Sequence, residues 1–284
     1  MSSMFFGHYL LENGVIGREA LLDAIERQRR TNRSLADIAV GEGLLDQSKA
    51  DQIHAMFRVS NSSHEDLCIS EGRLSPSDIE RLTRIQNAEW IRIGAALVKG
   101  GYLADAALTI QLENFNAIEA RQQRTLESEF NHLEESVIVR ACTELTLRHV
   151  TRISGTPVKL QRIDPSDGIL KQGFRRFAQN IVGDREFCIT LDLGEPLFSI
   201  AAKGMIGVDV DPAGDGARDA GCELINLIGG NTCTRLEPEG YTLRPEPPFS
   251  SDFSGSSQEK KPSIRGAALA GENYFELNIF INPP

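Results

Sequence analysis

The sequence predicts two domains of different fold class, an all-α helical-repeat domain over residues 1–116 and an α+β domain with a mostly antiparallel sheet over residues 131–284. Glycines at a constant spacing indicate the first, and apolar residues that alternate with a period of two indicate the second. A length of 284 residues fits two domains of about 100–200 residues each. Residues 117–130 are charged and rich in helix formers, so we expect a helical linker there.

The composition is that of a soluble globular protein and argues against several functional classes. The chain has 30 Lys and Arg against 40 Asp and Glu, a formal charge of −10, which disfavours broad binding of nucleic-acid phosphates. We find no apolar run of the roughly 18 residues that a membrane span needs, and no signal peptide. The 5 Cys form no CxxC pair and the 5 His show no ligand spacing, so we expect reduced thiols and no metal site. The expected localisation is cytoplasmic, with no nucleic-acid or membrane partner.

Four glycines in the first half define an internal repeat. Gly14, Gly43, Gly72 and Gly101 recur at a spacing of 29 residues (43 − 14, 72 − 43 and 101 − 72), and the flanking apolar positions keep the same register. Each repeat is predicted to be helix, turn, helix, with the glycine ending the first helix in the left-handed conformation. Ser75 followed by Pro76 is a typical helix start in the third repeat. Four stacked repeats would bury a common core that a single helix pair cannot bury.

The repeat sequences resemble a known family. FFGHYLLENGVIGREALLDAIERQ and RIGAALVKGGYLADAALTIQLENF are similar to the motif repeated in the amino-terminal domains of type II secretion and pilus assembly ATPases, the MshEN type. Some members bind c-di-GMP through a leading arginine and a closing glutamine of this motif. In chain order, the leading and closing positions here are occupied by Phe5 and Gln28, Ser34 and Phe57, Ser63 and Gln86, and Arg92 and Phe115.

No repeat therefore has both nucleotide-binding residue types. The resemblance implies a helical regulatory or docking module, and its alternative implication is a c-di-GMP effector that uses Arg92, Gln28 and Gln86.

The second half begins with a helix that is predicted to end near Gly155, and its pattern then changes period. The segments 186–193 and 274–281 alternate apolar residues with residues expected to face solvent, which predicts half-buried strands. The expected solvent-side residues are Glu186, Cys188, Thr190 and Asp192 in the first segment and Tyr274, Glu276, Asn278 and Phe280 in the second.

The remaining segments complete the expected α+β domain. Residues 159–163 are a predicted strand and 174–183 either a strand or a short helix, whereas 196–207 and 216–236 are predicted helices. The polar, Ser- and Gly-rich stretch 250–263 is predicted to be a flexible loop.

The predicted helix over about 216–235 is the most informative part of the chain. At 100° per residue, one arc is expected to face the core and consists of Ala220, Leu224, Leu227, Ile228 and Asn231. A second arc, roughly a quarter turn away, consists of Asp219, Glu223, Asn226 and Gly230. Glu223 and Asn226 are thus i, i+3 neighbours on one stripe. Three glycines inside this helix, each costing about 0.5–1 kcal/mol relative to alanine, require a packing or functional reason.

This helix also carries a family resemblance. CELINLIGGNTCTRLEPEGYTLRPEPP is similar to the signature of the CheX/CheC chemotaxis phosphatases, which has E-x-x-N, an isoleucine two residues on, and then Gly-Asn. The resemblance extends over about 131–284. Many members have a lysine soon after Gly-Asn, where this chain has Thr232-Cys233-Thr234, and one E-x-x-N site is visible here where CheC-type members have two.

The resemblance implies a response-regulator phosphatase whose substrate is the aspartyl phosphate of a CheY-like receiver. Asn226 would orient the attacking water and Glu223 would pair with the receiver's active-site lysine. Asp219, Gly230 and Asn231 would contact the partner. No cofactor of its own is implied, because the Mg²⁺ belongs to the receiver, and family members often form homodimers. The alternatives are a non-catalytic module that binds a receiver or dimerises, and the c-di-GMP effector described above.

Overall fold

The computed structural model describes residues 5–133, 135–163, 174–209, 211–212, 214–252, 264–271 and 273–281. Contacts between Cα atoms divide the chain into two compact units, with the division between Gln122 and Gln123. Helix α8 (Asp105–Asn131) is continuous across that division. Among the described helices, none combines the length and the apolar character that crossing a membrane requires.

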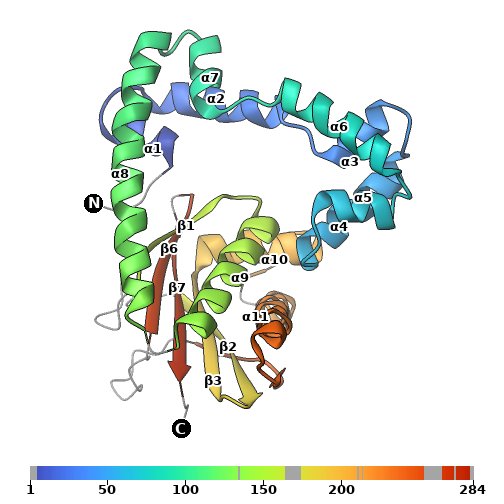
Figure 1. Ribbon diagram of the computed structural model, residues 1–284, viewed down its shortest axis with the longest axis vertical. Helices are drawn as coiled ribbons and strands as arrows, with labels where there is room; N and C mark the ends of the chain where they lie inside the picture. The colour runs from blue at the N-terminus through green and yellow to red at the C-terminus, as the bar shows by residue number, and fades with distance from the viewer. Residues whose placement is uncertain are drawn as a thin grey trace. The chain divides into compact units, whose positions relative to one another are not determined.

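The described elements of the first unit are helices (Figure 1). They are α1 (Phe6–Glu12), α2 (Arg18–Thr31), α3 (Leu35–Gly41), α4 (Gln47–Val59), α5 (His64–Ser70), α6 (Pro76–Glu89), α7 (Ile93–Lys99) and the first part of α8. Three of them begin with a capping box, in which Ser34, Ser63 or Ser75 accepts from the amide of an aspartate three residues later. Pro76 occupies the first turn of α6, as the sequence predicted.

The turns after the first helix of each repeat follow the prediction in three repeats and depart from it in one. Gly14, Gly43 and Gly101 have φ values of 67°, 72° and 76°. In the third repeat, Arg73 has the positive φ, at 54°, in place of Gly72. The Gly72 amide there donates to the Leu67 carbonyl at 3.2 Å and Leu74 donates to Cys68 at 3.1 Å, which shifts the left-handed residue by one position.

The four repeats form two hydrophobic cores rather than the single stack that the sequence predicted. Repeats one and four share a core that includes Leu10, Leu21 and Leu97, and we call this pair the outer lobe. Repeats two and three share a core that includes Ile38 and Leu82, and we call this pair the inner lobe. A helix pair of this size can bury its apolar face against one other helix pair. Two separate cores therefore bury the apolar faces of all four repeats without a continuous stack.

The second unit is α+β, with one antiparallel sheet. Its described helices are the end of α8, α9 (Ser136–Ser154), α10 (Glu195–Ile206) and α11 (Asp215–Leu236), followed by a short 3₁₀ turn at Glu237–Glu239. Its strands are β1 (Val158–Ile163), β2 (Phe174–Gly183), β3 (Phe187–Gly194), β4 (Leu243–Pro245), β5 (Phe249–Asp252), β6 (Ile264–Ala270) and β7 (Asn273–Ile281). The order is β1-β6-β7-β3-β2-β4, with β5 also paired to β2.

The strands also settle the ambiguous parts of the sequence. Residues 174–183 form strand β2. The loop predicted for 250–263 is wrong for its first residues, because Ser250 lies in β5, which pairs in register with β2. Ser and Asp have low strand propensity, so pairing with β2 and not local preference determines this strand. The rest of the predicted loop, 253–263, lies outside the described residues.

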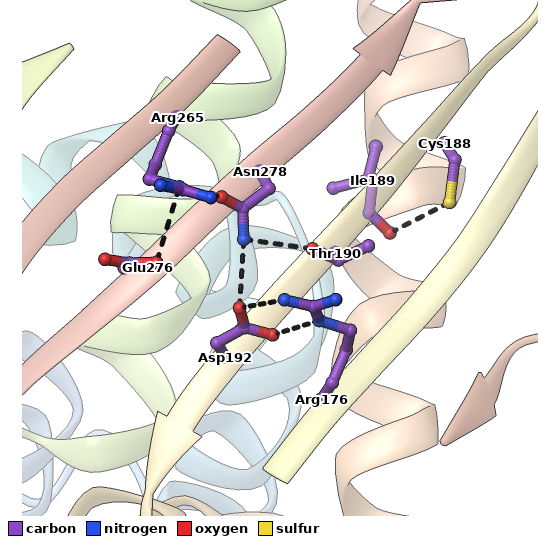
Figure 2. Close-up of polar contacts among 8 residues, drawn as sticks. All are labelled: Arg176, Cys188, Ile189, Thr190, Asp192, Arg265, Glu276 and Asn278. Carbon is purple, nitrogen blue, oxygen red and sulfur yellow. Dashed lines mark hydrogen bonds and ion pairs between the residues drawn. The ribbon is translucent and has the colours of Figure 1, made fainter. Parts of the chain in front are cut away.

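One face of the sheet packs on α9, α10 and α11, and the other face holds a buried polar network (Figures 1 and 2). Phe187, Ile189 and Leu191 of β3 belong to the core shared with the helices. Five of the residues expected to face solvent, Cys188, Thr190, Asp192, Glu276 and Asn278, are instead buried, with Asp192 2% and Asn278 0% exposed. Glu186, just before β3, and Tyr274, near the start of β7, are exposed as predicted, so the prediction of a solvent-facing side is wrong for the central part of both strands.

Ion pairs and hydrogen bonds make this burial possible. Arg176 binds both oxygens of Asp192, at 2.7 and 2.8 Å, and Asn278 donates to Asp192 at 3.0 Å and to Thr190 at 3.2 Å. Arg265 donates to Asn278 at 2.9 Å and lies 3.6 Å from Glu276. Figure 2 shows Asp192 between Arg176 and Asn278. Asp192 and Glu276 are directly opposite across β3 and β7, so the two arginines offset a repulsion between like charges.

His149 of α9 gives the second unit a pH-dependent stability. It is fully buried, and neither ring nitrogen has a hydrogen-bond partner among the described residues. Burial lowers its pKa to about 4, with Arg152 and Arg148 acting in the same direction. In the unfolded chain the pKa is about 6.5, so below that pH the unfolded state binds a proton that the folded state does not.

We therefore expect the free energy of unfolding to fall by about 2–3 kcal/mol between pH 7 and pH 4.5 through this group. Urea unfolding across that range measures the fall. The variant His149→Met should lose this part of the pH dependence, and an identical pH profile for both proteins would contradict the assignment.

Candidate functional site

Helix α11 is buried on two sides, and a third side is left open. Ala220, Leu224 and Ile228 of the predicted core arc are buried, whereas Leu227 and Asn231 are only half-buried. A second buried line, Gly221, Ile225 and Gly229, was not predicted. The cause is strand β2, which packs directly on α11 through this line.

The three helical glycines now have separate explanations. A Cβ on Gly221 would lie 2.2 Å from the Phe177 ring, and a Cβ on Gly229 would lie 2.0 Å from Oε1 of Gln179. A Cβ on Gly230 would meet nothing within 4 Å. The first two glycines therefore allow α11 to approach β2 closely, while Gly230 belongs to the open side.

Alanine substitutions at the adjacent glycines should have opposite effects on stability. We expect Gly229→Ala to lower the free energy of unfolding by about 1–3 kcal/mol, because the new Cβ overlaps Gln179. Gly230→Ala should raise the free energy of unfolding by about 0.5–1 kcal/mol, because alanine stabilises a helix relative to glycine where the added Cβ meets no neighbour. Urea unfolding of the two variants compares them directly, and equal shifts of the same sign would contradict the close approach.

The predicted stripe of polar residues lies on the open side of α11. Asp219 and Glu223 are exposed, and Asn226 and Gly230 are half-buried. Asn226 Oδ1 accepts a hydrogen bond from Gln179 Nε2 at 2.8 Å. Within the described part of the chain, Glu223 forms no ion pair, so its carboxylate faces solvent.

The side chain of Asn231, another predicted site residue, is hydrogen-bonded within its own helix. Its Nδ2 donates to the Leu227 carbonyl at 2.8 Å. The structure thus brings Glu223 and Asn226 together on one side of α11, with Gly230 one turn further along.

A short segment before and within β5 runs beside this stripe. The Glu246 carbonyl accepts from Gln179 Nε2 at 2.8 Å, and the Glu246 amide donates to Asn180 at 2.9 Å. At the other end, strand β5 packs on α11, with Ser250 near the thiol of Cys222. Phe249 between them is 48% exposed. Residues 246–250 therefore form a wall along the stripe, and Phe249 adds an apolar surface to it.

The thiols near the site are unsuited to nucleophilic chemistry. Burial raises the pKa of Cys222, and it raises the pKa of Cys233 to about 11. All five cysteines are free. Because the thiolate is the reactive form, Cys222 and Cys233 are expected to be unreactive thiols.

Sequence reasoning missed Gln179, which is fully buried and connects β2, α11 and the wall. A signal was present: Phe177, Gln179 and Ile181 alternate in β2, and glutamine is the polar exception on a buried face. Because 174–183 was ambiguous between strand and helix, the faces of this segment could not be assigned.

The residues predicted for nucleotide binding are divided between the two lobes of the first unit. In the outer lobe, Gln28 Nε2 donates to the Ile91 carbonyl at 3.0 Å, and Ile91 directly precedes Arg92. In the inner lobe, Gln86 Nε2 donates at 2.9 Å to the carbonyl of Arg33, which precedes Ser34. A closing glutamine of one repeat thus lies beside the leading position of its partner repeat in both lobes.

The closing phenylalanines follow the same rule. Phe115 lies against Phe6, with ring centroids 5.2 Å apart, and Phe57 lies against His64 at 4.0 Å. Each lobe therefore combines one repeat closed by glutamine with one closed by phenylalanine. Of the two lobes, only the outer one combines an arginine at a leading position with a glutamine at the closing position of the partner repeat.

Comparisons with known proteins give structural neighbours for part of the chain. No family model matches the chain, and no curated protein matches it. It is similar to the solved chemotaxis protein CheX from Vibrio vulnificus (TM-score 0.46, 14% identity, 51% of this chain and 99% of that chain). It is also similar to CheX from Desulfovibrio desulfuricans (TM-score 0.45, 18% identity, 51% of this chain and 99% of that chain). A third is the CheX-CheY-BeF₃-Mg²⁺ complex from Borrelia burgdorferi (TM-score 0.41, 16% identity, 52% of this chain and 96% of that chain). The structural neighbours are thus CheX- and CheC-like chemotaxis proteins that cover about half of the chain.

Proposed function

We propose that this protein is a phosphatase that removes the aspartyl phosphate of a CheY-like response-regulator receiver. The observation that carries the proposal is the pair Glu223 and Asn226 on the open side of α11, inside a sequence that resembles the CheX/CheC signature. Asn226 is one turn from Gly230, where nothing lies within 4 Å of the added Cβ position. A partner backbone can therefore approach the helix closely at this point.

The chemistry needs no nucleophile from this chain. An aspartyl phosphate is an activated acyl phosphate, and its Mg²⁺ would be held by the receiver, so the phosphatase has to place a water in line with the scissile bond. The Asn226 carboxamide can accept a hydrogen bond from that water and donate one to a phosphoryl oxygen without adding negative charge. Water attacks phosphorus, the P–O bond to the receiver aspartate breaks, and inorganic phosphate leaves.

Glu223 has a different role, which is to pair with the receiver's active-site lysine. Its exposed carboxylate forms no ion pair within the described residues, and so it is available to a cationic partner. We expect Glu223→Ala to raise the half-saturating receiver concentration about 10-fold, equivalent to about 1.4 kcal/mol. The measurement is the rate of dephosphorylation as a function of receiver concentration.

A control and a double-mutant cycle make this test specific. Asp215→Ala removes an exposed carboxylate from the first turn of the same helix and should leave the half-saturating concentration unchanged. Replacing the receiver lysine by alanine should remove most of the effect of Glu223→Ala. Additive effects of the two substitutions would contradict the pairing.

A non-catalytic receiver-binding module is the alternative for the same site. It predicts a measurable complex with the receiver and no acceleration of phosphate loss. The homodimer expected from the family stays a prediction, which sedimentation velocity of the full chain can check.

A second candidate function is recognition of c-di-GMP by an MshEN-like first unit. The observation that favours it is the outer lobe, where Gln28 contacts the residue before Arg92. Calorimetry with c-di-GMP should then show micromolar binding that Arg92→Ala or Gln28→Ala abolishes. Gln86 lies in the inner lobe, whose leading position is Ser34, so Gln86→Ala tests whether that lobe contributes to binding as well. Without binding by the wild-type chain, a regulatory docking module is the remaining role for this unit.

A further inference from the structure

We infer that Gln179 is a positioning residue that holds the Asn226 carboxamide in one of its two orientations, an inference that rests on the phosphatase function proposed above. Its Nε2 lies 2.8 Å from the Glu246 carbonyl oxygen and 2.8 Å from Asn226 Oδ1. Strand β2 supplies Gln179, helix α11 supplies Asn226, and the wall supplies Glu246.

The order of donors and acceptors fixes the orientation. A backbone carbonyl can only accept, so the Gln179 group facing Glu246 has to be the NH₂ group. The second hydrogen of that NH₂ group points to Asn226, whose facing atom has to be the acceptor Oδ1. The Nδ2 of Asn226 is thereby directed away from β2, and one lone pair of Oδ1 stays available. One backbone carbonyl thus sets the orientation of two successive amides.

This orientation suits the proposed chemistry. The outward Nδ2 can donate to a phosphoryl oxygen, and the remaining lone pair of Oδ1 can accept from the attacking water. A carboxamide turned by 180° would exchange these two atoms and present a donor to the water. A hydrogen bond from Gln179 also polarises the Asn226 amide and strengthens its outward donor.

Gln179 is retained at a cost that packing alone does not explain. The side chain is fully buried, and its Oε1 has no hydrogen-bond partner among the described residues. Gly229 provides the space, because any Cβ there would lie 2.0 Å from that Oε1. An apolar side chain of the same length would fill this space in the core and leave no unpaired acceptor. The polar group is therefore explained by what it does to Asn226.

Gln179→Met tests the inference, because methionine keeps the length of the side chain and removes the amide. We expect the maximal dephosphorylation rate to fall about 10- to 100-fold, with the half-saturating receiver concentration within about 2-fold of wild type. The midpoint of urea unfolding should stay the same or rise. Asn180→Ala is the matched control: Asn180 bonds the Glu246 side chain at 3.3 Å from the next position of β2, and its loss should not change the rate.

A second readout does not depend on activity. The Asn226 side-chain ¹⁵N resonance should be shifted downfield in the wild type, because its Oδ1 accepts a hydrogen bond, and this shift should be lost in Gln179→Met. An unchanged maximal rate in an active enzyme, or a rate that falls only together with the unfolding midpoint, would overturn the inference. If the wild type lacks phosphatase activity, the proposed function fails, and unchanged Asn226 resonances would then overturn the positioning role.

Discussion

Asn226→Ala should reduce the dephosphorylation rate of the receiver to within about 2-fold of its spontaneous rate, a loss of at least about 100-fold at saturation. The physical reason is that the carboxamide is the only group assigned to the attacking water, so its removal leaves the receiver's own Mg²⁺ and residues to act alone. The rate is measured by following phosphate loss from the phosphorylated receiver at a fixed concentration of each variant.

The fold should survive this substitution. Asn226 is half-buried on the open side of α11, and Gln179 keeps its second hydrogen bond, to Glu246, when Asn226 is lost. We expect the free energy of unfolding to change by less than about 1 kcal/mol. Asn226→Asp is a second, more specific variant. It keeps the acceptor for Gln179 but places a negative charge against the phosphoryl group. Wild-type activity in either variant would contradict the role of Asn226.

Asp192→Ala should lower the free energy of unfolding by about 3–5 kcal/mol, the largest stability effect that we expect. The substitution leaves the Arg176 guanidinium, whose side chain is 13% exposed, without its two-point partner. It also removes an acceptor from the fully buried Asn278. The loss is measured by urea unfolding followed by circular dichroism.

An exposed ion pair provides the control for the buried one. Asp209 pairs with Lys203 at 2.8 Å, but its side chain is 85% exposed, so Asp209→Ala should cost less than about 0.5 kcal/mol. Replacing both partners, as in Arg176→Met with Asp192→Leu, should recover most of the stability that Asp192→Ala loses. A loss below about 1 kcal/mol for Asp192→Ala would show that the network contributes little.

Periodicity and capping in the sequence predicted much of the fold, because these signals are local. The 100° spacing in α11 placed Glu223 and Asn226 on one stripe, and the structure has both on the open side. Ser75 with Pro76 marked the start of α6, and the alternating residues of 186–193 marked β3. Each of these depends on residues within one or two turns of each other.

The features that sequence reasoning missed depend on contacts between distant residues. Gln179 and Asn226 are 47 positions apart, and their hydrogen bond depends on how β2 packs on α11. The pairing of repeat one with repeat four cannot be deduced from a repeat whose register is equal in all four copies. The burial of Asp192 follows from Arg176 on a neighbouring strand, whereas an aspartate in an alternating pattern indicates a solvent face.

The central claim is that this chain accelerates the loss of phosphate from a phosphorylated CheY-like receiver. The most direct measurement is the first-order decay of phosphorylated receiver with and without a substoichiometric amount of the wild-type chain, with Mg²⁺ present for the receiver. We predict a decay at least about 10-fold faster with the chain, and repeated turnover of each molecule. Equal decay in both samples, at concentrations where the chain binds the receiver, would contradict the claim.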